Sequence, residues 1–249
     1  MMLGPATKTF SKRIPANLFL LCLVLACFPS FSQNLKVLPA SEELSAYVKN
    51  EAGRVLLQRF KCFEGRHEHN QFSITLCGDV PDNERPMKPW SKKEPGHVFI
   101  VLTMHDTVCQ YDAVSFVFGF YPRRPASSVI FKNVRCEIAD NSKRRYDVRI
   151  EKTLSAPEFE LVLENSIAFA QKKYNLNHYN CYNYALDVFN SLPGIEKLPV
   201  NKIRFPFIAG KGGSPCCLYR DLKKLQLEGS VWSPYINFGS FKAPVSCTN

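Results

Sequence analysis

The sequence predicts an α+β domain in which an antiparallel sheet has helices packed on one side. The predicted elements run in the order helix, strands, helix, helix, with no internal repeat among them. Strands that are grouped in this way favour antiparallel pairing, because parallel strands need long crossovers between them. The 249 residues, 45% apolar and 22% charged, suit a globular domain with a substantial core.

Residues 1–32 have the three-part pattern of a secretory signal peptide. Three basic residues precede the apolar run NLFLLCLVLACF, which is too short to span a bilayer, and small serines follow it. We expect cleavage after Ser32 and a secreted, periplasmic or cell-envelope protein. A lipoprotein signal with Cys27 lipidated is the alternative. No other run of about 20 apolar residues is present, so we expect no stable membrane insertion.

Cleavage would lower the formal net charge from +10 to +7, with 29 basic against 22 acidic residues. A basic surface suits an anionic partner such as a cell-wall polymer, an acidic lipid headgroup or nucleic acid. The basic runs at 143–145 and 223–224 are short and scattered, which favours simple solubility. We therefore expect no nucleic-acid partner.

The chain up to residue 155 contains one predicted helix and five predicted strands. Residues 33–69 are expected to be a helical extension, whose helix begins at the N-cap Ser41, and 70–249 the main domain with a C-terminal tail. Residues 78–96 contain four prolines and are expected to be a surface loop. The expected strands are 72–77, 97–104, 113–122, 127–139 and 144–155, the last of them more polar and placed at an edge.

Three helices are predicted in the second half. The helix at 154–174 is capped by Ser155 and has Pro157 in its first turn. Asn180 caps a helix over 181–192, and Ser214 opens a last one. The tail after this helix is expected to be extended.

Eight cysteines remain after cleavage, enough for four disulfides in a secreted protein. The sequence suggests a bridge from Cys62 to Cys77 and a second one from Cys109 to Cys136. If Cys181 stays free, at least one further cysteine is also unpaired. Two histidines, His67 and His69, could join Cys62 and Cys77 in a zinc site, but the spacing fits no common pattern. We expect no metal and no cofactor.

Cys181 has the sequence position of a reactive thiol. It shares a helix face with Tyr184 and Val188, so a buried core cysteine is one interpretation. At the first turn of a helix, however, the unpaired backbone N–H groups lower the pKa of a thiol. A neighbouring histidine could act as its general base. Among five histidines, His97 stands at the start of a strongly apolar strand, where a polar ring needs a partner.

Several motifs resemble those of the circularly permuted papain-like cysteine hydrolases. A proline-rich loop ending in GHVFIVL, a strand ending in GFYP, and the later YNCYNYALDVFNSLPG carry the resemblance, which covers about residues 70–226. The superfamily includes cell-wall peptide amidases and lecithin:retinol acyltransferase-like enzymes, and the pattern is most similar to that of secreted bacterial members. The loop ending in Ser-Pro and the following helix fit it as well, whereas Cys216 and Cys217 depart from it.

The resemblance implies a permuted papain-like fold and a role for each motif residue. Cys181 would attack a carbonyl carbon, and His97 would accept the thiol proton and return it to the leaving group. The Cys181 backbone N–H and the Asn180 side chain would hold the oxyanion. No orienting third residue is evident; Ser115 and Asp112 are the candidates. The expected cleft-lining residues are Tyr121, Tyr179, Tyr182 and His178.

The activity expected on this basis is that of a secreted thiol hydrolase that cuts an amide in peptidoglycan stem peptides or another extracellular peptide. A lipid acyltransferase or lipase with a thioester intermediate is an alternative. A second alternative is a non-catalytic binding module of the same fold, with Cys181 tied in a disulfide. The sequence leaves the oligomeric state open.

Overall fold

The computed structural model describes residues 48–64, 69–89, 95–107, 113–130, 132–206 and 209–248, all within one compact unit that spans Asn34–Asn249. Among these residues, no helix is both long and apolar enough to cross a bilayer. Several predictions fall outside the described residues: the signal peptide, the lipidation site Cys27, the helix cap Ser41, and the side chains of His67, Cys109 and Asp112.

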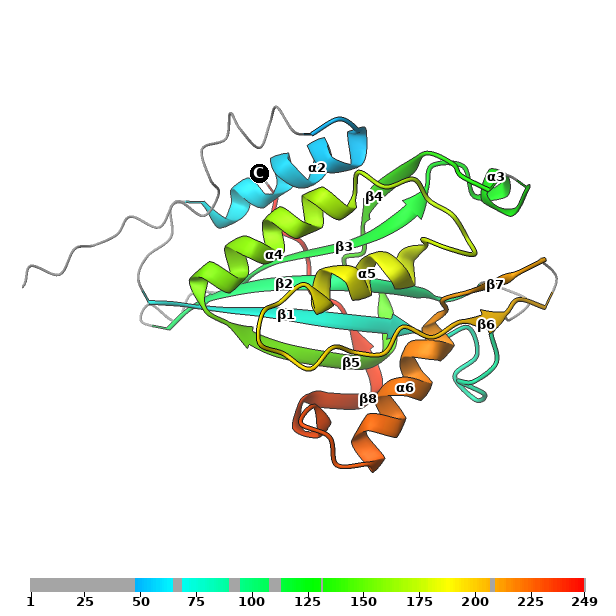
Figure 1. The fold of residues 1–249 in the computed structure, drawn as a ribbon. Helices are drawn as coiled ribbons and strands as arrows, with labels where there is room; N and C mark the ends of the chain where they lie inside the picture. Colours follow the sequence, from blue (N-terminus) through cyan, green and yellow to red (C-terminus); the bar gives the residue numbers. More distant parts are fainter. Residues whose placement is uncertain are drawn as a thin grey trace, which may run out of the picture. The chain divides into compact units, whose positions relative to one another are not determined.

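A six-stranded antiparallel sheet forms the centre of the unit, in the order β4-β3-β2-β1-β5-β8 (Figure 1). The C-terminal tail supplies β8, which pairs with β5. Strand β5 is therefore interior, and its predicted edge position is wrong. The strands are β1 (Asn70–Asp79), β2 (His97–Asp106), β3 (Val114–Pro122), β4 (Cys136–Asp140), β5 (Arg145–Leu154) and β8 (Ile236–Lys242), with a small separate ribbon of β6 (Ile203–Arg204) and β7 (Lys211–Gly212).

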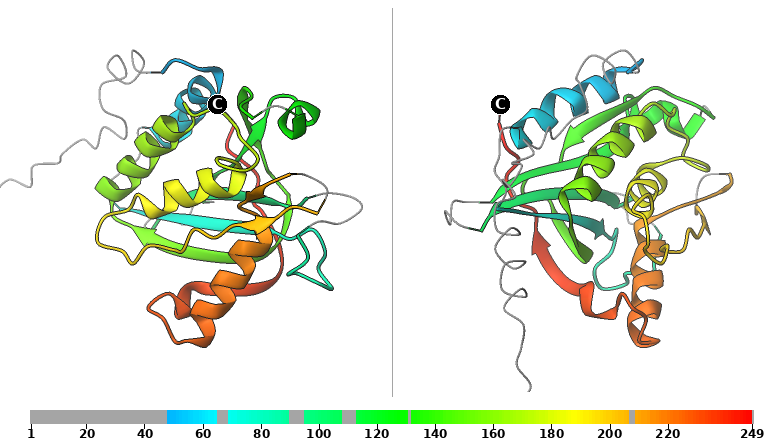
Figure 2. Two further views of the ribbon diagram at one scale, coloured as in Figure 1. Left: turned by 45° about the vertical axis from the view of Figure 1, so that its right-hand side comes forward. Right: turned by 60° about the vertical axis from the view of Figure 1, so that its left-hand side comes forward.

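Helices α2, α4, α5 and α6 contribute to one large core with a single face of this sheet (Figure 2). The predicted α+β class with an antiparallel sheet is thus confirmed. The helices are α2 (Glu51–Arg59), α3 (Pro125–Ile130), α4 (Ala156–Phe169), α5 (Cys181–Asn190) and α6 (Pro215–Leu227), with short 3₁₀ turns η2 (Phe60–Phe63) and η3 (Ser233–Tyr235). Because α2 buries Ala52 and Leu56 in the same core, the described part of the predicted N-terminal extension packs as part of the domain.

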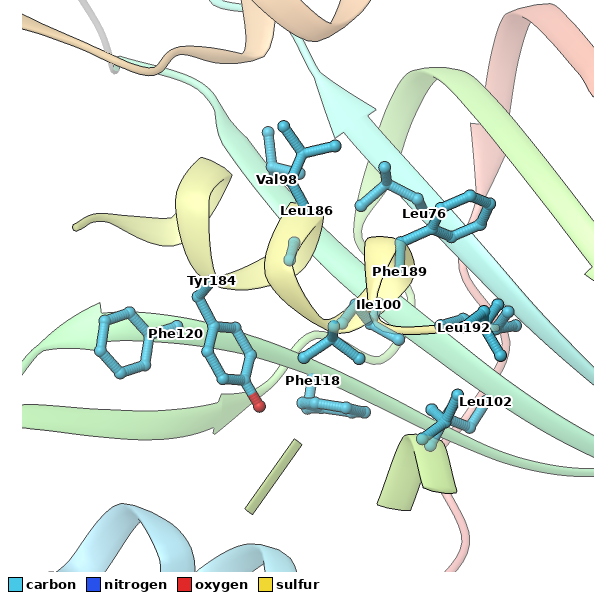
Figure 3. Packing of buried hydrophobic residues seen from close by; sticks show 14 of the residues in the cluster. Leu76, Val98, Ile100, Leu102, Phe118, Phe120, Tyr184, Leu186, Phe189 and Leu192 are labelled. Atoms are coloured by element: carbon cyan, nitrogen blue, oxygen red, sulfur yellow. The ribbon is translucent and has the colours of Figure 1, made fainter. Parts of the chain in front are cut away.

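Helix α5 is fixed against the middle of the sheet by fully buried side chains (Figure 3). The Tyr184 ring stacks on the Phe120 ring of β3, with centroids 4.8 Å apart. Phe189 belongs to the same core as Ile100 of β2. Truncating a core aromatic of this kind costs about 3–5 kcal/mol. The first turn of α5 is therefore held firmly at one end of the sheet.

Two predicted elements, the first helix and the strand at 127–139, differ from the structure. Helix α2 begins at Glu51, because the Asn50 side chain caps it by accepting a hydrogen bond from the Gly53 N–H at 2.9 Å. The predicted strand 127–139 is instead α3 followed by the short β4. Proline at the first position of α3 favours a helix start, and the Ser127 and Ser128 hydroxyls bond to backbone carbonyls three residues earlier.

The later helices begin where predicted. Ser155 forms a capping box with Glu158 at the start of α4, and Ser214 accepts a hydrogen bond from the Cys216 N–H at the start of α6. Helix α4 ends at Phe169, five residues before the predicted end.

The C-terminal tail continues from β8 and is held to the sheet by hydrogen bonds. Ser246 Oγ accepts from the Val117 N–H at 3.0 Å, and the Cys247 N–H donates to the Ser115 carbonyl at 2.7 Å. A disulfide joins Cys62 to Cys247, with Cα atoms 6.2 Å apart. The predicted bridges are therefore wrong.

The cysteines of those predicted bridges have other environments. Cys77 is a free thiol that lies fully buried in the smaller core on the second face of the sheet. Cys136 is also free, and its thiol lies 3.5 Å from the Ala170 carbonyl oxygen.

We expect the Cys62→Ser, Cys247→Ser double variant to lose about 2–5 kcal/mol of unfolding free energy, because the bridge closes a loop over a sequence separation of 185. Urea titration followed by tryptophan fluorescence measures the change. A Cys136→Ser variant, which alters a free buried thiol, is the matched control. An unchanged urea midpoint in the double variant would contradict the prediction.

Candidate active site

Cys181 occupies the first position of α5, directly after the N-cap Asn180. The Asn180 Oδ1 atom accepts hydrogen bonds from the N–H groups of Tyr182 and Asn183 at 3.0 and 3.4 Å. Its Nδ2 donates to the carbonyls of Leu176 and Gly213, both at 2.9 Å. Since both amide hydrogens already have acceptors, the predicted oxyanion contact of Asn180 would require one of these bonds to break. The observed role of this side chain is to fix the helix start.

Cys181 and His97 line the same cavity, whose volume is about 400 Å³. Cys181 is partly exposed, whereas the other four free cysteines of the described chain are buried. Cys181 therefore borders a space that a ligand can enter. Most of the lining is apolar or aromatic, including Phe120, Tyr121, Val129, Tyr174, Leu176 and Phe205.

His97 reaches this cavity from the start of β2. Alternation along the strand places Val98 in the core beneath α5, and puts His97 on the other face with Phe99. The His97 ring stacks on the Tyr121 ring of β3, with centroids 4.1 Å apart and planes 19° from parallel. Within the described residues no hydrogen bond joins His97 to Cys181. The two residues meet only at the cavity, where the sheet ends.

Asn141, in the turn between β4 and β5, is a site residue that the sequence analysis missed. Its Oδ1 and the His97 Nε2 are both buried without a hydrogen-bond partner. Both atoms lie above Gly119, where an added Cβ would meet Nε2 at 2.2 Å and Oδ1 at 2.5 Å. The bare glycine thus leaves the space in which these two polar atoms approach each other. Asn141 Nδ2 also donates to the Tyr121 hydroxyl at 2.6 Å.

Burial and the nearby Arg144 guanidinium hold the pKa of His97 well below its usual range. Arg144 donates two hydrogen bonds to one carboxylate oxygen of Asp79, at 2.6 and 2.9 Å. At neutral pH the imidazole is therefore uncharged and able to accept a proton. The pKa of His97 is lower in the folded protein than in the unfolded chain. Its contribution to the free energy of unfolding is therefore fully present above pH 6.5 and declines as the pH falls below that value.

Burial also raises the pKa of the Cys181 thiol above its ordinary value. Hydrogen bonds from backbone N–H groups, that of Val98 foremost, and the charge of Arg144 act in the opposite direction without reversing the shift. The expected lowering of this pKa by the helix start is therefore wrong in its net direction. The resting pair is a neutral thiol and a neutral imidazole, so the thiol needs a base to become a nucleophile.

We expect the rate of Cys181 alkylation by iodoacetamide to keep rising above pH 8.5, since the thiolate forms only beyond the ordinary thiol pKa of about 8.5. Peptide mass spectrometry at a series of pH values measures this rate for Cys181 alone. A rate that is already constant from pH 6 upward would indicate a thiolate–imidazolium pair and contradict the prediction.

Of the residues predicted to support the site, Tyr121 and Asn180 line the cavity, whereas Ser115 and the other predicted cleft residues do not. Ser115 is buried, and its hydroxyl lies 3.2 Å from the Thr103 hydroxyl. It stands roughly 20 Å along β3 from Tyr121, at about 3.3 Å per residue, so it cannot orient His97. His178 is exposed on the turn before α5.

The remaining two tyrosines serve packing instead. Tyr182 is fully buried and accepts a hydrogen bond from the Asn201 N–H at 3.0 Å. Tyr179 packs edge-on against Phe120, and the Lys172 ammonium lies 4.3 Å from its ring centroid.

No group of three or more histidine, cysteine, aspartate or glutamate side chains in the described part of the chain could hold a metal ion. Cys62, one member of the zinc set considered from the sequence, is in a disulfide. No family model, no curated protein and no solved structure matches this chain.

Proposed function

We propose that the protein is a thiol hydrolase that cleaves an amide bond, with Cys181 as nucleophile and His97 as general base and acid. The observation that carries the proposal is that Cys181, a free and half-buried cysteine at a helix start, and the buried neutral imidazole of His97 line one cavity. The similarity of the surrounding motifs to permuted papain-like hydrolases supports the same conclusion.

The reaction begins when His97 removes the proton from the Cys181 thiol and the sulfur attacks the carbonyl carbon of a bound amide. The new oxyanion is stabilised by backbone N–H groups at the start of α5. His97 then gives its proton to the amine as the C–N bond breaks, which leaves a thioester on Cys181. A water molecule, deprotonated by His97, attacks the thioester carbonyl; the C–S bond then breaks, a carboxylic acid is released, and His97 returns the proton to the Cys181 sulfur.

Asn141 is proposed as the positioning residue for His97. If His97 Nε2 carries the hydrogen, it can donate toward Asn141 Oδ1, and Nδ1 remains as the basic nitrogen. The Asn141 amide is itself held by its bond to the Tyr121 hydroxyl, and the Tyr121 ring stacks on His97. This arrangement would keep the imidazole in one plane and one tautomer.

The aromatic and apolar cavity suits an apolar group beside the scissile bond. With the signal peptide expected from the sequence, the best-supported substrate is an extracellular peptide or a peptidoglycan stem peptide. The same lining favours an acyl chain, so a lipid acyltransferase or lipase that uses the same thioester is the second candidate. The free Cys181 thiol counts against a module that holds this cysteine in a disulfide.

Incubation of the mature protein with purified peptidoglycan, with casein peptides and with phospholipid vesicles tests the proposal. Acid quenching followed by mass spectrometry should detect an acyl adduct on Cys181, and the released amines identify an amide substrate. The adduct and the products should be absent for Cys181→Ala and present for the control Cys136→Ser. Adduct formation with the vesicles alone would support the second candidate. Products that persist in Cys181→Ala, or no adduct with any substrate, would overturn the thiol mechanism.

A further inference from the structure

Two cavities of about 510 and 420 Å³ lie next to the candidate active site, and both are lined by Arg123 and Arg135. We call the combined surface the arginine groove. Its basic lining residues are Arg123, Arg124 and Arg135, with Lys49, Arg54, Lys172 and Lys173 further along. The only acid that lines it within the described residues is Glu51.

The positive charge of the groove is largely uncompensated. Arg54 has Glu51 at 3.6 Å, and Lys172 has Asp187 at 2.9 Å. In the part of the chain that the structure describes, the exposed guanidinium groups of the other three arginines form no ion pair. The groove therefore presents strong hydrogen-bond donors that have no acidic side chain to bind.

Arg123 and Arg135 are held side by side by the backbone. The last pair of the β3–β4 ladder is Pro122 with Cys136, and the two arginines lie one residue beyond this pair, one next to each strand. The Arg123 N–H donates to the Arg135 carbonyl at 2.9 Å. Like charges directly opposite each other in a sheet are destabilising. A bound anion would remove this repulsion, so the arrangement favours an anionic ligand.

The arginine groove and the cavity that contains Cys181 are lined by neighbouring residues of one segment. Pro122, Ala126 and Ser128 line that cavity, and the neighbouring Arg123, Arg124 and Ser127 line the groove. One segment, residues 121–128, therefore separates the two spaces.

We propose that the arginine groove binds an acidic segment of a polypeptide substrate, with carboxylates close to the amide bond cut at Cys181. This inference rests on the proposed function. Arginine binds carboxylates through two parallel hydrogen bonds, which suits glutamate and aspartate side chains. No aromatic side chain lines the groove in the described residues, so the stacking platform typical of single-stranded nucleic acid is absent from this surface.

Binding to the Cys181→Ala protein tests the proposal without requiring catalysis. A fluorescent peptide with several glutamates is compared with its glutamine counterpart by anisotropy. We expect the glutamate peptide to bind at least about tenfold more tightly, with affinity falling as salt is added. Arg123→Gln with Arg135→Gln should reduce this affinity about tenfold or more. The matched control, Lys223→Gln with Lys224→Gln on exposed α6 positions, removes the same charge and should change it less than about twofold.

Equal losses in the two double variants, or equal affinities for the two peptides, would overturn the acidic-segment proposal. Tighter, arginine-dependent binding of an oligonucleotide or of anionic vesicles would overturn the choice of ligand. If the glutamate peptide binds as expected but the wild-type protein forms no acyl adduct with any peptide, the hydrolase function fails and the anion site stands. If peptides with and without glutamate are hydrolysed at the same rate, the hydrolase function stands and the acidic-segment proposal is rejected.

Discussion

Replacing His97 by glutamine is expected to slow acylation of Cys181 at pH 7 by about 10²–10⁴-fold, the usual contribution of a positioned base. Glutamine is similar in length and keeps hydrogen-bonding atoms, but it cannot accept the thiol proton. Because burial raises the pKa of Cys181, the thiolate does not form at neutral pH without a base. The rate of adduct formation, measured by rapid quenching and mass spectrometry, gives the size of the loss.

Two comparisons separate this chemical role from a structural one. His105→Gln alters an exposed histidine on the same strand and should leave the acylation rate unchanged. Near pH 10, where hydroxide can deprotonate the thiol, iodoacetamide should alkylate Cys181 in His97→Gln about as fast as in the wild type. If alkylation at pH 10 falls as much as acylation at pH 7, the substitution has damaged the cavity, and a base role for His97 is rejected.

Local sequence patterns correctly predicted the elements that have a clear hydrophobic pattern or a clear helix-capping residue. The apolar run after His97 became β2, and Ser155, Asn180 and Ser214 cap helices as expected. The segment after Pro122 was misassigned because its β-branched residues favour a strand, whereas Pro125 and two serine hydroxyls stabilise a helical turn. The edge position of β5 was wrong because its partner β8 comes from the distant C-terminal tail.

The candidate site was predictable only in part, for a similar reason. Cys181 and His97 could be selected because each stands at the start of a regular element, where the sequence is distinctive. Asn141 lies in an ordinary polar turn, and its relation to His97 depends on the β3–β4 register that places Gly119 between them. Ser115 was selected because it lies on the strand that follows β2. The register of the two strands pairs it with Thr103 and not with His97.

The direction of the Cys181 pKa shift could not be predicted from the local sequence either. A helix start stabilises the thiolate, and the sequence shows that feature directly. The opposing effect is desolvation by the walls of the cavity, which are built from β2, β3 and the loops before α5 and α6. Only the folded arrangement determines that burial is the larger of the two.

Gly119→Ala is expected to lower the hydrolysis rate by about 10²-fold or more, because misplacement of a catalytic group by about 1 Å can have an effect of that size. The new methyl group would occupy the space between His97 Nε2 and Asn141 Oδ1, at 2.2 and 2.5 Å, so both side chains must move. The loss should appear in kcat with little change in KM, since the cavity wall that would hold the substrate is otherwise intact. Steady-state kinetics on the substrate found by acyl-adduct mass spectrometry measures both constants.

The matched control for this variant is Gly53→Ala on α2. Its added methyl group would also meet a side-chain nitrogen at 2.2 Å, that of Gln171, but it lies outside the catalytic cavity. Overpacking of this kind costs about 1–3 kcal/mol of stability, so both variants should show a lower thermal midpoint. Only Gly119→Ala should lose turnover per folded molecule, because only there does the crowding move the imidazole. If both variants keep full turnover, or both lose it in proportion to stability, the proposed positioning of His97 by Asn141 has no part in catalysis.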